Sequence, residues 1–78
     1  MSESRLLDTK GLNCPIPVLK ARRAMRDLRD GDILTVEATD PASYIDFRHF
    51  CDTTGHELLE AKEDEPSGVF TYVIRCVK

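Results

Sequence analysis

Gly11-Leu12-Asn13-Cys14-Pro15-Ile16-Pro17 is the stretch where this chain is expected to pass from a strand into an amphipathic helix. Proline is well tolerated in the first turn of a helix, because its missing N–H would be unpaired there. The Cys14 thiol is therefore expected at the N-cap or at the residue beside it. Free backbone N–H groups and the helix dipole would stabilise a thiolate at that position. The sequence thus predicts a Cys14 pKa below about 8.5, the value of a free cysteine.

The chemistry of this stretch centres on the sulfur atom of Cys14. A thiolate at a helix start can accept and pass on a sulfur atom, form a mixed disulfide or bind a soft metal. A plain cap would more often be Ser, Thr, Asp or Asn, so cysteine favours a reactive role. Pro15 and Pro17 have no N–H group, which leaves few backbone donors in the first turn and makes them supporting residues of the motif.

Hydrophobic periodicity predicts the remaining secondary structure. Alternating apolar and polar residues indicate four strands, at residues 5–9, 33–39, 56–62 and 69–77. Apolar residues at three- and four-residue spacing indicate two helices, at residues 15–29 and 40–54. Asp40 is expected to cap the second helix, with Pro41 as its first residue and Gly55 as its stop. The expected buried faces are Val18, Ala21, Met25 and Leu28; Leu34, Val36 and Ala38; Phe47, Phe50, Cys51 and Thr54; and Phe70, Tyr72, Ile74 and Cys76.

The order of elements is β-α-β-α-β-β, which defines an α/β fold. Crossover connections require some strands to run parallel, whereas the last two strands form a hairpin. The expected architecture is a two-layer sandwich, with a mixed four-stranded sheet and two helices on one face. The other sheet face should be wet or used by a partner. At 78 residues the chain is expected to be a single domain, residues 1–78.

Composition narrows the classes of function. A net charge of −3 argues against direct nucleic-acid binding. No signal peptide or membrane span is recognisable, and the three cysteines are not paired in sequence, so a cytoplasmic location with reduced thiols is expected. Cys51 and Cys76 are interpreted as small hydrophobic residues of the core.

Charged and metal-binding residues give weaker signals. The first helix carries Lys20 and four arginines, which form either a solvated face or a docking face for an acidic partner protein; the candidate docking residues are Arg22, Arg23, Arg26 and Arg29. The spacing of His49 and His56 indicates no metal site, and no cofactor is expected. His56 follows a helix end, where the dipole favours a charged imidazole. Asp46 is interpreted as a solvated helix residue.

Cys14-Pro15-Ile16-Pro17 forms a Cys-Pro-x-Pro motif that is similar to the hallmark of the TusA-like (SirA-like) sulfur-carrier family. Other motifs fall in that family's order and approximate spacing, over about residues 6–76; they are Leu7-Asp8, Gly31-Asp32, Asp40-Pro41, Asp46, Phe50-Cys51, Gly55-His56-Glu57-Leu58 and Tyr72-Val73-Ile74-Arg75. The resemblance implies the β-α-β-α-β-β fold. It also implies a sulfurtransferase that carries sulfane sulfur as a persulfide on Cys14.

The resemblance further implies two protein partners and no cofactor. One partner is a sulfur donor such as a cysteine desulfurase, and the other is a downstream sulfur acceptor. Branches of the family serve tRNA thiolation, molybdenum-cofactor biosynthesis, sulfur oxidation or selenium metabolism, and the sequence leaves the branch open. The alternative reading is a non-catalytic redox-sensing or regulatory interaction module that uses Cys14.

Overall fold

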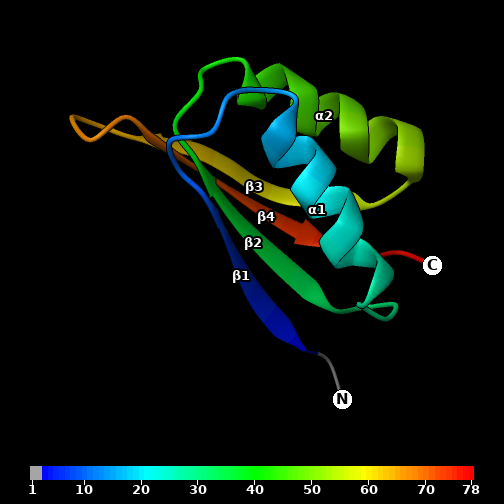
Figure 1. Ribbon diagram of the computed structural model, residues 1–78. Coiled ribbons are helices and arrows are strands. Elements are labelled where there is room, and N and C mark those ends of the chain that lie inside the picture. The colour runs from blue at the N-terminus through cyan, green and yellow to red at the C-terminus, as the bar shows by residue number, and fades with distance from the viewer. Residues whose placement is uncertain (1–2) are drawn as a thin grey trace.

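The computed structural model describes residues 3–78, which form the predicted sequence of strands and helices (Figure 1). The elements are β1 (Ser4–Thr9), α1 (Ile16–Arg26), β2 (Ile33–Ala38), α2 (Ser43–Thr54), β3 (Glu57–Asp64) and β4 (Val69–Arg75). Each predicted element is therefore present, and most of the strand ends differ from the expected ones by one or two residues.

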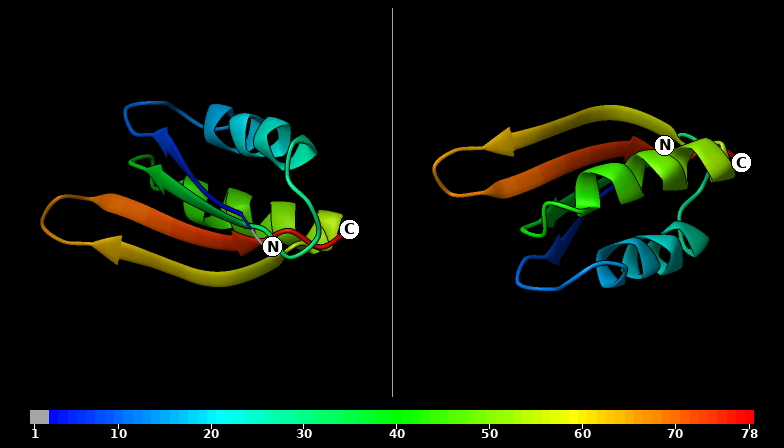
Figure 2. Two further views of the ribbon diagram at one scale, coloured as in Figure 1. Left: turned by 90° about the horizontal axis from the view of Figure 1, so that it is seen from below. Right: turned by 90° about the horizontal axis from the view of Figure 1, so that it is seen from above.

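The four strands form one mixed sheet in the order β1-β2-β4-β3. β1 and β2 are parallel, and β4 is antiparallel to both of its neighbours. Both helices cover the same face of the sheet (Figure 2), which confirms the predicted two-layer architecture. Because β1 and β2 are adjacent and parallel, they end at the same edge, where Thr9 pairs with Ala38. The connections that lead into α1 and α2 consequently meet at that edge.

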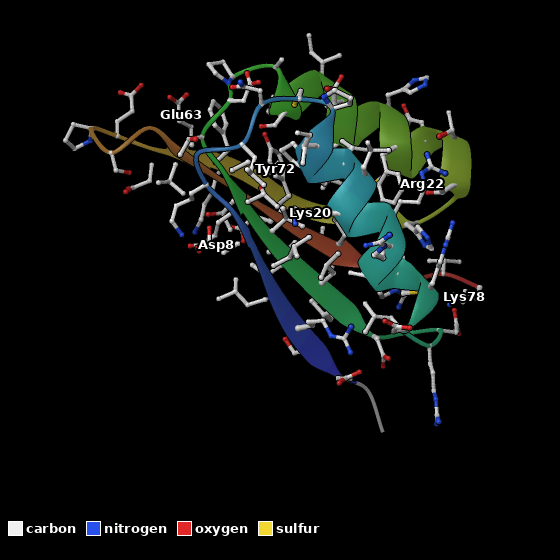
Figure 3. All side chains as sticks on the ribbon, viewed as in Figure 1. Asp8, Lys20, Arg22, Glu63, Tyr72 and Lys78 are labelled. Carbon is white, nitrogen blue, oxygen red and sulfur yellow. The ribbon has the colours of Figure 1, made fainter. Side chains whose placement is uncertain are left out.

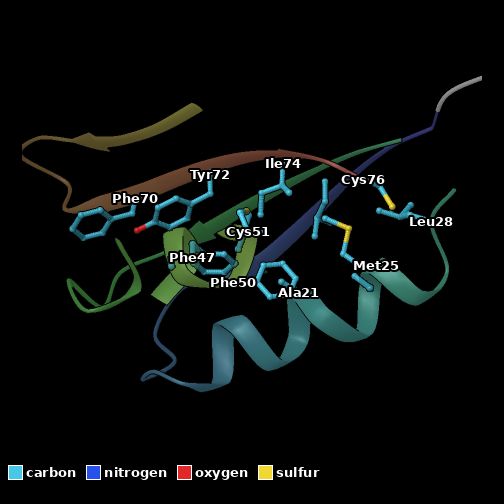
Figure 4. Close-up of a cluster of buried hydrophobic side chains, with 14 residues drawn as sticks. Ala21, Met25, Leu28, Phe47, Phe50, Cys51, Phe70, Tyr72, Ile74 and Cys76 are labelled. Carbon is cyan, nitrogen blue, oxygen red and sulfur yellow. The ribbon is translucent and has the colours of Figure 1, made fainter. Parts of the chain in front are cut away.

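The hydrophobic core lies between the sheet and the helices (Figure 4). The alternation predicted for the last strand is confirmed, since its inward residues are all buried; they are Phe70, Tyr72, Ile74 and Cys76. The ring of Phe47 stacks on that of Tyr72 with 4.6 Å between centroids. The hydroxyl groups of Tyr72 and Ser43 are 2.7 Å apart and hydrogen-bond inside the core. This contact fixes the first turn of α2 above β4.

The first helix is shorter than predicted, because it ends at Arg26 and not at Arg29. The N–H groups of Asp27 and Leu28 bond to carbonyls three residues earlier, which tightens the last turn. The N–H of Arg29 then donates to Oδ2 of Asp32 at 2.8 Å. Local hydrogen bonds thus replace the helix, although Leu28 still reaches the core.

The second helix begins at Ser43, so the expected start at Asp40 and Pro41 is wrong. Asp40 forms a turn before the helix, in which its carbonyl oxygen accepts from the N–H of Ser43 at 2.9 Å. Its Oδ1 accepts from the N–H of Ala42 at 3.0 Å. Gly55 ends the helix with a φ of 85°, which confirms the predicted stop.

Candidate functional site

Cys14 lies at the sheet edge where β1 and β2 both end. It is half-buried, one residue before Pro15, the N-cap of α1. Its backbone N–H donates to Oδ2 of Asp40 at 2.8 Å. The loop that carries the thiol is therefore attached to the connection between β2 and α2.

The predicted low pKa of Cys14 is wrong. Burial, followed by the carboxylates of Asp46 and Asp40, raises the pKa of the thiol to about 12. A thiolate here would lose hydration and would face negative charge, and both effects favour the protonated thiol. The free protein consequently holds Cys14 as a neutral thiol at neutral pH.

The helix start offers the thiol few backbone donors. Pro15 and Pro17 have no N–H. The N–H of Ile16 donates to the carbonyl oxygen of Asn13 at 2.9 Å. The prolines that make the motif recognisable thus also remove two of the donors that were expected to stabilise a thiolate.

Asp46 is the site residue that sequence reasoning missed. It lies in the first turn of α2 and is half-buried, contrary to its interpretation as a solvated residue. Its carboxylate is one of the groups that raise the pKa of the Cys14 thiol. This influence joins residues from different elements, so no spacing in the sequence signals it.

A hollow of about 170 Å³ lies between α1 and α2 and reaches Pro15, the residue after Cys14. It is lined by Pro15, Val18, Arg22, Asp46, His49 and Phe50. The guanidinium of Arg22 lies over the ring of Phe50, 5.3 Å from its centroid. The hollow therefore combines a carboxylate and an imidazole with one cationic side chain, one residue along the chain from Cys14.

The candidate docking arginines do not form one set. Arg22, Arg23 and Arg26 line a shallow groove on α1 together with Leu19 and Lys20. Figure 3 shows Lys20 and Arg22 projecting from different sides of this helix. Within residues 3–78, none of the three groove arginines forms an ion pair.

Arg29 lies apart from that groove. It lines a separate hollow with three acidic residues, Glu3, Asp27 and Asp32. Large apolar side chains are exposed at the starts of both helices; they are Ile16, Leu19, Tyr44 and Ile45. These apolar side chains lie toward the Cys14 end of the molecule, whereas the groove runs along α1 to Arg26 at the other end of that helix.

The remaining candidate residues, Cys51, Cys76 and His56, are held within the fold. Cys51 and Cys76 are buried, as predicted, and burial raises the pKa of both thiols. His56 accepts the N–H of Val77 at Nδ1, at 3.0 Å. Burial, followed by the charge of Lys78, lowers the pKa of His56, so the expected charged imidazole is wrong. No helix within residues 3–78 is long and apolar enough to cross a membrane.

Known proteins share this sequence and this fold. The family model described as "Sulfurtransferase TusA" matches residues 5–76. A Neisseria meningitidis protein named as a candidate sulfur carrier is 49% identical over 72 residues, covering 92% of this chain and 95% of its own. Sulfur carrier protein TusA of Allochromatium vinosum is 45% identical over 69 residues, covering 88% of each chain.

A solved structure with the same fold leads to the same family. The crystal structure of a SirA-like protein from Desulfitobacterium hafniense superposes with a TM-score of 0.82 at 27% identity. The match covers 95% of this chain and 99% of that one. The compact α/β fold with a cysteine at the strand-to-helix edge is that of a small sulfur-handling protein. The chain belongs to the TusA family.

Proposed function

We propose that this protein is a sulfur carrier that accepts sulfane sulfur as a persulfide on Cys14 and passes it to a partner protein. Family membership supports the sulfur-carrier role. The observation that selects the residue is exposure, because Cys14 is half-buried whereas Cys51 and Cys76 are buried in the core. A persulfide must reach sulfur atoms of other proteins, and only an accessible thiol allows this.

The loading step is a thiol–persulfide exchange. The Cys14 sulfur attacks the outer sulfur of a donor persulfide, and the S–S bond of the donor breaks. Cys14–SH and donor–S–SH thus become Cys14–S–SH and donor–SH, so that the proton lost by Cys14 ends on the donor thiol. In the unloading step, an acceptor thiolate attacks the outer sulfur and restores the Cys14 thiol. No cofactor is needed for either step.

The donor and acceptor are proteins that dock around Cys14. The groove arginines and the exposed apolar side chains fit a donor with acidic and apolar surface, such as a cysteine desulfurase. The acceptor belongs to a sulfur-relay pathway, for example tRNA thiolation. We place the protein in the cytoplasm because its three thiols are free.

A redox-sensing module is the alternative function. Such a sensor pairs an accessible cysteine with a resolving thiol. Both other cysteines are buried in the hydrophobic core, which favours the carrier.

Mass spectrometry tests the proposal. Incubation with a cysteine desulfurase and cysteine should add the mass of one sulfur atom, and dithiothreitol should remove it. Cys14→Ser should not be loaded, whereas Cys51→Ala should be loaded like the wild type. Loading on Cys51, or wild-type protein that takes up no sulfur from any donor tested, would overturn the assignment.

A further inference from the structure

The sheet edge formed by β1 is unpaired on its outer side. Within residues 3–78, β1 stands first in the strand order and pairs only with β2. The backbone of Glu3 turns toward β2, since its carbonyl oxygen accepts from the N–H of Ile33 at 2.8 Å and its N–H donates to Oδ1 of Asp32 at 2.7 Å. Successive residues of a strand direct these backbone groups to opposite sides. Alternate residues of β1 therefore direct their N–H and carbonyl groups away from the sheet; these residues are Ser4, Leu6 and Asp8.

β1 lacks the features by which proteins usually block an exposed edge. It contains no proline, and its register with β2 is regular over Ser4–Thr9. Its charged side chains lie close to opposite charges, since Arg5 pairs with Asp27 and Asp8 pairs with Lys10. The strand at the other edge, β3, has an irregular register and is rich in acidic residues. A further strand would consequently pair with β1 more readily than with β3.

One side of α1 brings positive charge to this edge. Asp27, the C-cap of α1, lies beside β1, because its Oδ2 is 3.9 Å from Nη1 of Arg5. Residues four and seven positions apart share one side of a helix, so Arg23 and Lys20 lie on the side that Asp27 occupies. Figure 3 shows Lys20 on the side of α1 that faces away from α2. In the described part of the chain, neither cation forms an ion pair.

Leu6 supplies an apolar contact on the opposite, open face of the sheet. Its side chain is 63% exposed and lies in one row with Thr35 of β2 and Val73 of β4. An apolar side chain on an added strand would extend that row and cover Leu6. Because side chains alternate along a strand, the intervening residues of the same segment would face Lys20 and Arg23. The edge thus fits an extended segment in which apolar and acidic residues alternate.

We propose that the outer edge of β1 binds an extended segment of a partner protein as a fifth strand, with acidic side chains toward Lys20 and Arg23 and apolar side chains toward Leu6. Recognition of this kind takes its affinity from backbone hydrogen bonds and its specificity from alternate side chains. A second copy of this chain fits less well, because pairing of β1 with β1 would place two α1 helices side by side with like charges facing each other. The inference goes beyond the proposed carrier function and does not depend on it.

A synthetic peptide of alternating sequence provides the test. The probe is acetylated and amidated Thr-Glu-Val-Glu-Val-Glu-Val-Thr, titrated into the protein and followed by NMR. The amide signals of Ser4, Leu6 and Asp8 should shift and their hydrogen exchange should slow, because these N–H groups would gain acceptors. The amides of Arg5 and Leu7 face β2 and should change less. A peptide with lysine in place of glutamate should bind more weakly, and one with N-methyl groups on alternate amides should not bind.

Two substitutions separate the apolar contact from the charged one. Leu6→Ser and Lys20→Glu should each weaken binding of the glutamate peptide by about fivefold, the size expected for one cross-strand or charged contact. Leu59→Ser is the matched control for the first, since Leu59 is an exposed apolar residue of the opposite edge strand. Arg48→Glu, at an exposed position of α2, is the control for the second. Equal thermal unfolding of all variants shows that the fold is intact.

Three outcomes would overturn the proposal. The first is an absence of shifts along β1 at saturating peptide solubility, and the second is equal binding by Leu6→Ser and Leu59→Ser. The third is a doubled mass in sedimentation, with a protected Leu6 amide in the absence of peptide, because a second copy would then be the occupant. Sulfur loading of the wild type tests the carrier function separately, since these binding measurements need no reactive thiol.

Discussion

The backbone N–H of Cys14 donates to Oδ2 of Asp40 over 2.8 Å, although the two residues lie 26 positions apart. This hydrogen bond joins the loop after β1 to the connection after β2, at the edge where the two parallel strands end. The position of the thiol is therefore set by a side chain from outside its own motif.

Removal of the Asp40 carboxylate should loosen the loop that carries Cys14. Asp40→Ala leaves the N–H groups of Cys14 and Ala42 without their acceptor, and both amides should then exchange faster with solvent. The urea midpoint should fall without a change in slope, because a native-state interaction is lost. Hydrogen exchange followed by NMR checks the first effect. Asp52→Ala, on the exposed side of α2, is the control. Equal exchange rates in both variants would show that the Asp40 carboxylate does not hold the loop in place.

The raised pKa of Cys14 predicts slow chemistry in the isolated protein. The wild type should alkylate more slowly than free cysteine at neutral pH, and the rate should still be rising above about pH 8.5, where a free cysteine is half ionised. Stopped assays across this range, with Cys14→Ser to subtract the buried thiols, measure the profile. A plateau reached by neutral pH would restore the view that the helix start activates the thiol.

His56 should make stability depend on pH in the mildly acidic range. Its pKa is lowered from 6.5 in the folded protein, mainly by burial. The unfolded state therefore binds the proton more tightly, so the stability from the neutral imidazole is full above about pH 6.5 and is lost as the pH falls through the folded pKa. Thermal unfolding between neutral and mildly acid pH measures the loss.

His56→Asn keeps an acceptor for the N–H of Val77 and should flatten this dependence. His49→Asn, at an exposed position, should leave it as in the wild type. If His49→Asn changes the pH dependence of stability and His56→Asn does not, the contact between His56 and Val77 is unimportant for it.

The groove on α1 should affect transfer between proteins through its charge. Arg23 and Arg26 line it and lie outside the hollow beside Cys14. Arg23→Glu/Arg26→Glu should slow sulfur loading from the cognate donor at low salt, because exposed charges mainly set the association rate. The difference should shrink at physiological salt, where screening acts over about 8 Å. Alkylation of Cys14 should be unaffected.

Arg29→Glu is the matched control for this experiment, since Arg29 lies in the acidic hollow away from the groove. Loading rates that are equal in all three proteins at low salt would mean that the arginines form only a solvated helix face.

Cys51 should act in the core and not in transfer. Cys51→Ala removes a small buried side chain and should lower the free energy of unfolding by about 1 kcal/mol. Chemical denaturation measures this change. An unfolding free energy equal to that of the wild type would show that the side chain contributes little to packing.

The sequence predicted the features that are encoded locally. The inward residues of β4 alternate with outward ones, so Phe70, Tyr72 and Ile74 were assigned to the core correctly. The stop at Gly55 was also found, because a left-handed helix end favours glycine in any fold. The Cys-Pro-x-Pro motif is also encoded locally, so the sequence alone points to Cys14 as the candidate site residue.

The features that were missed depend on contacts between distant residues. Asp40 reads as a helix cap, yet its carboxylate serves the amide of Cys14 and so the helix begins later. Asp46 reads as a solvated residue because the hollow that it lines exists only after α1 and α2 pack together. The reversed direction of the Cys14 pKa follows from that same packing.

The register of the sheet has a consequence for how the protein can be attached to other molecules. Ser4 and Arg75 both pair with Ile33. The chain therefore enters and leaves the sheet at the strand ends opposite Cys14. The N–H of Lys78 is held there by Oδ1 of Asp30 at 3.0 Å. A tether, a surface anchor or a fused domain joined at either terminus would therefore start from the far side of the molecule and leave the sulfur free to meet its partners.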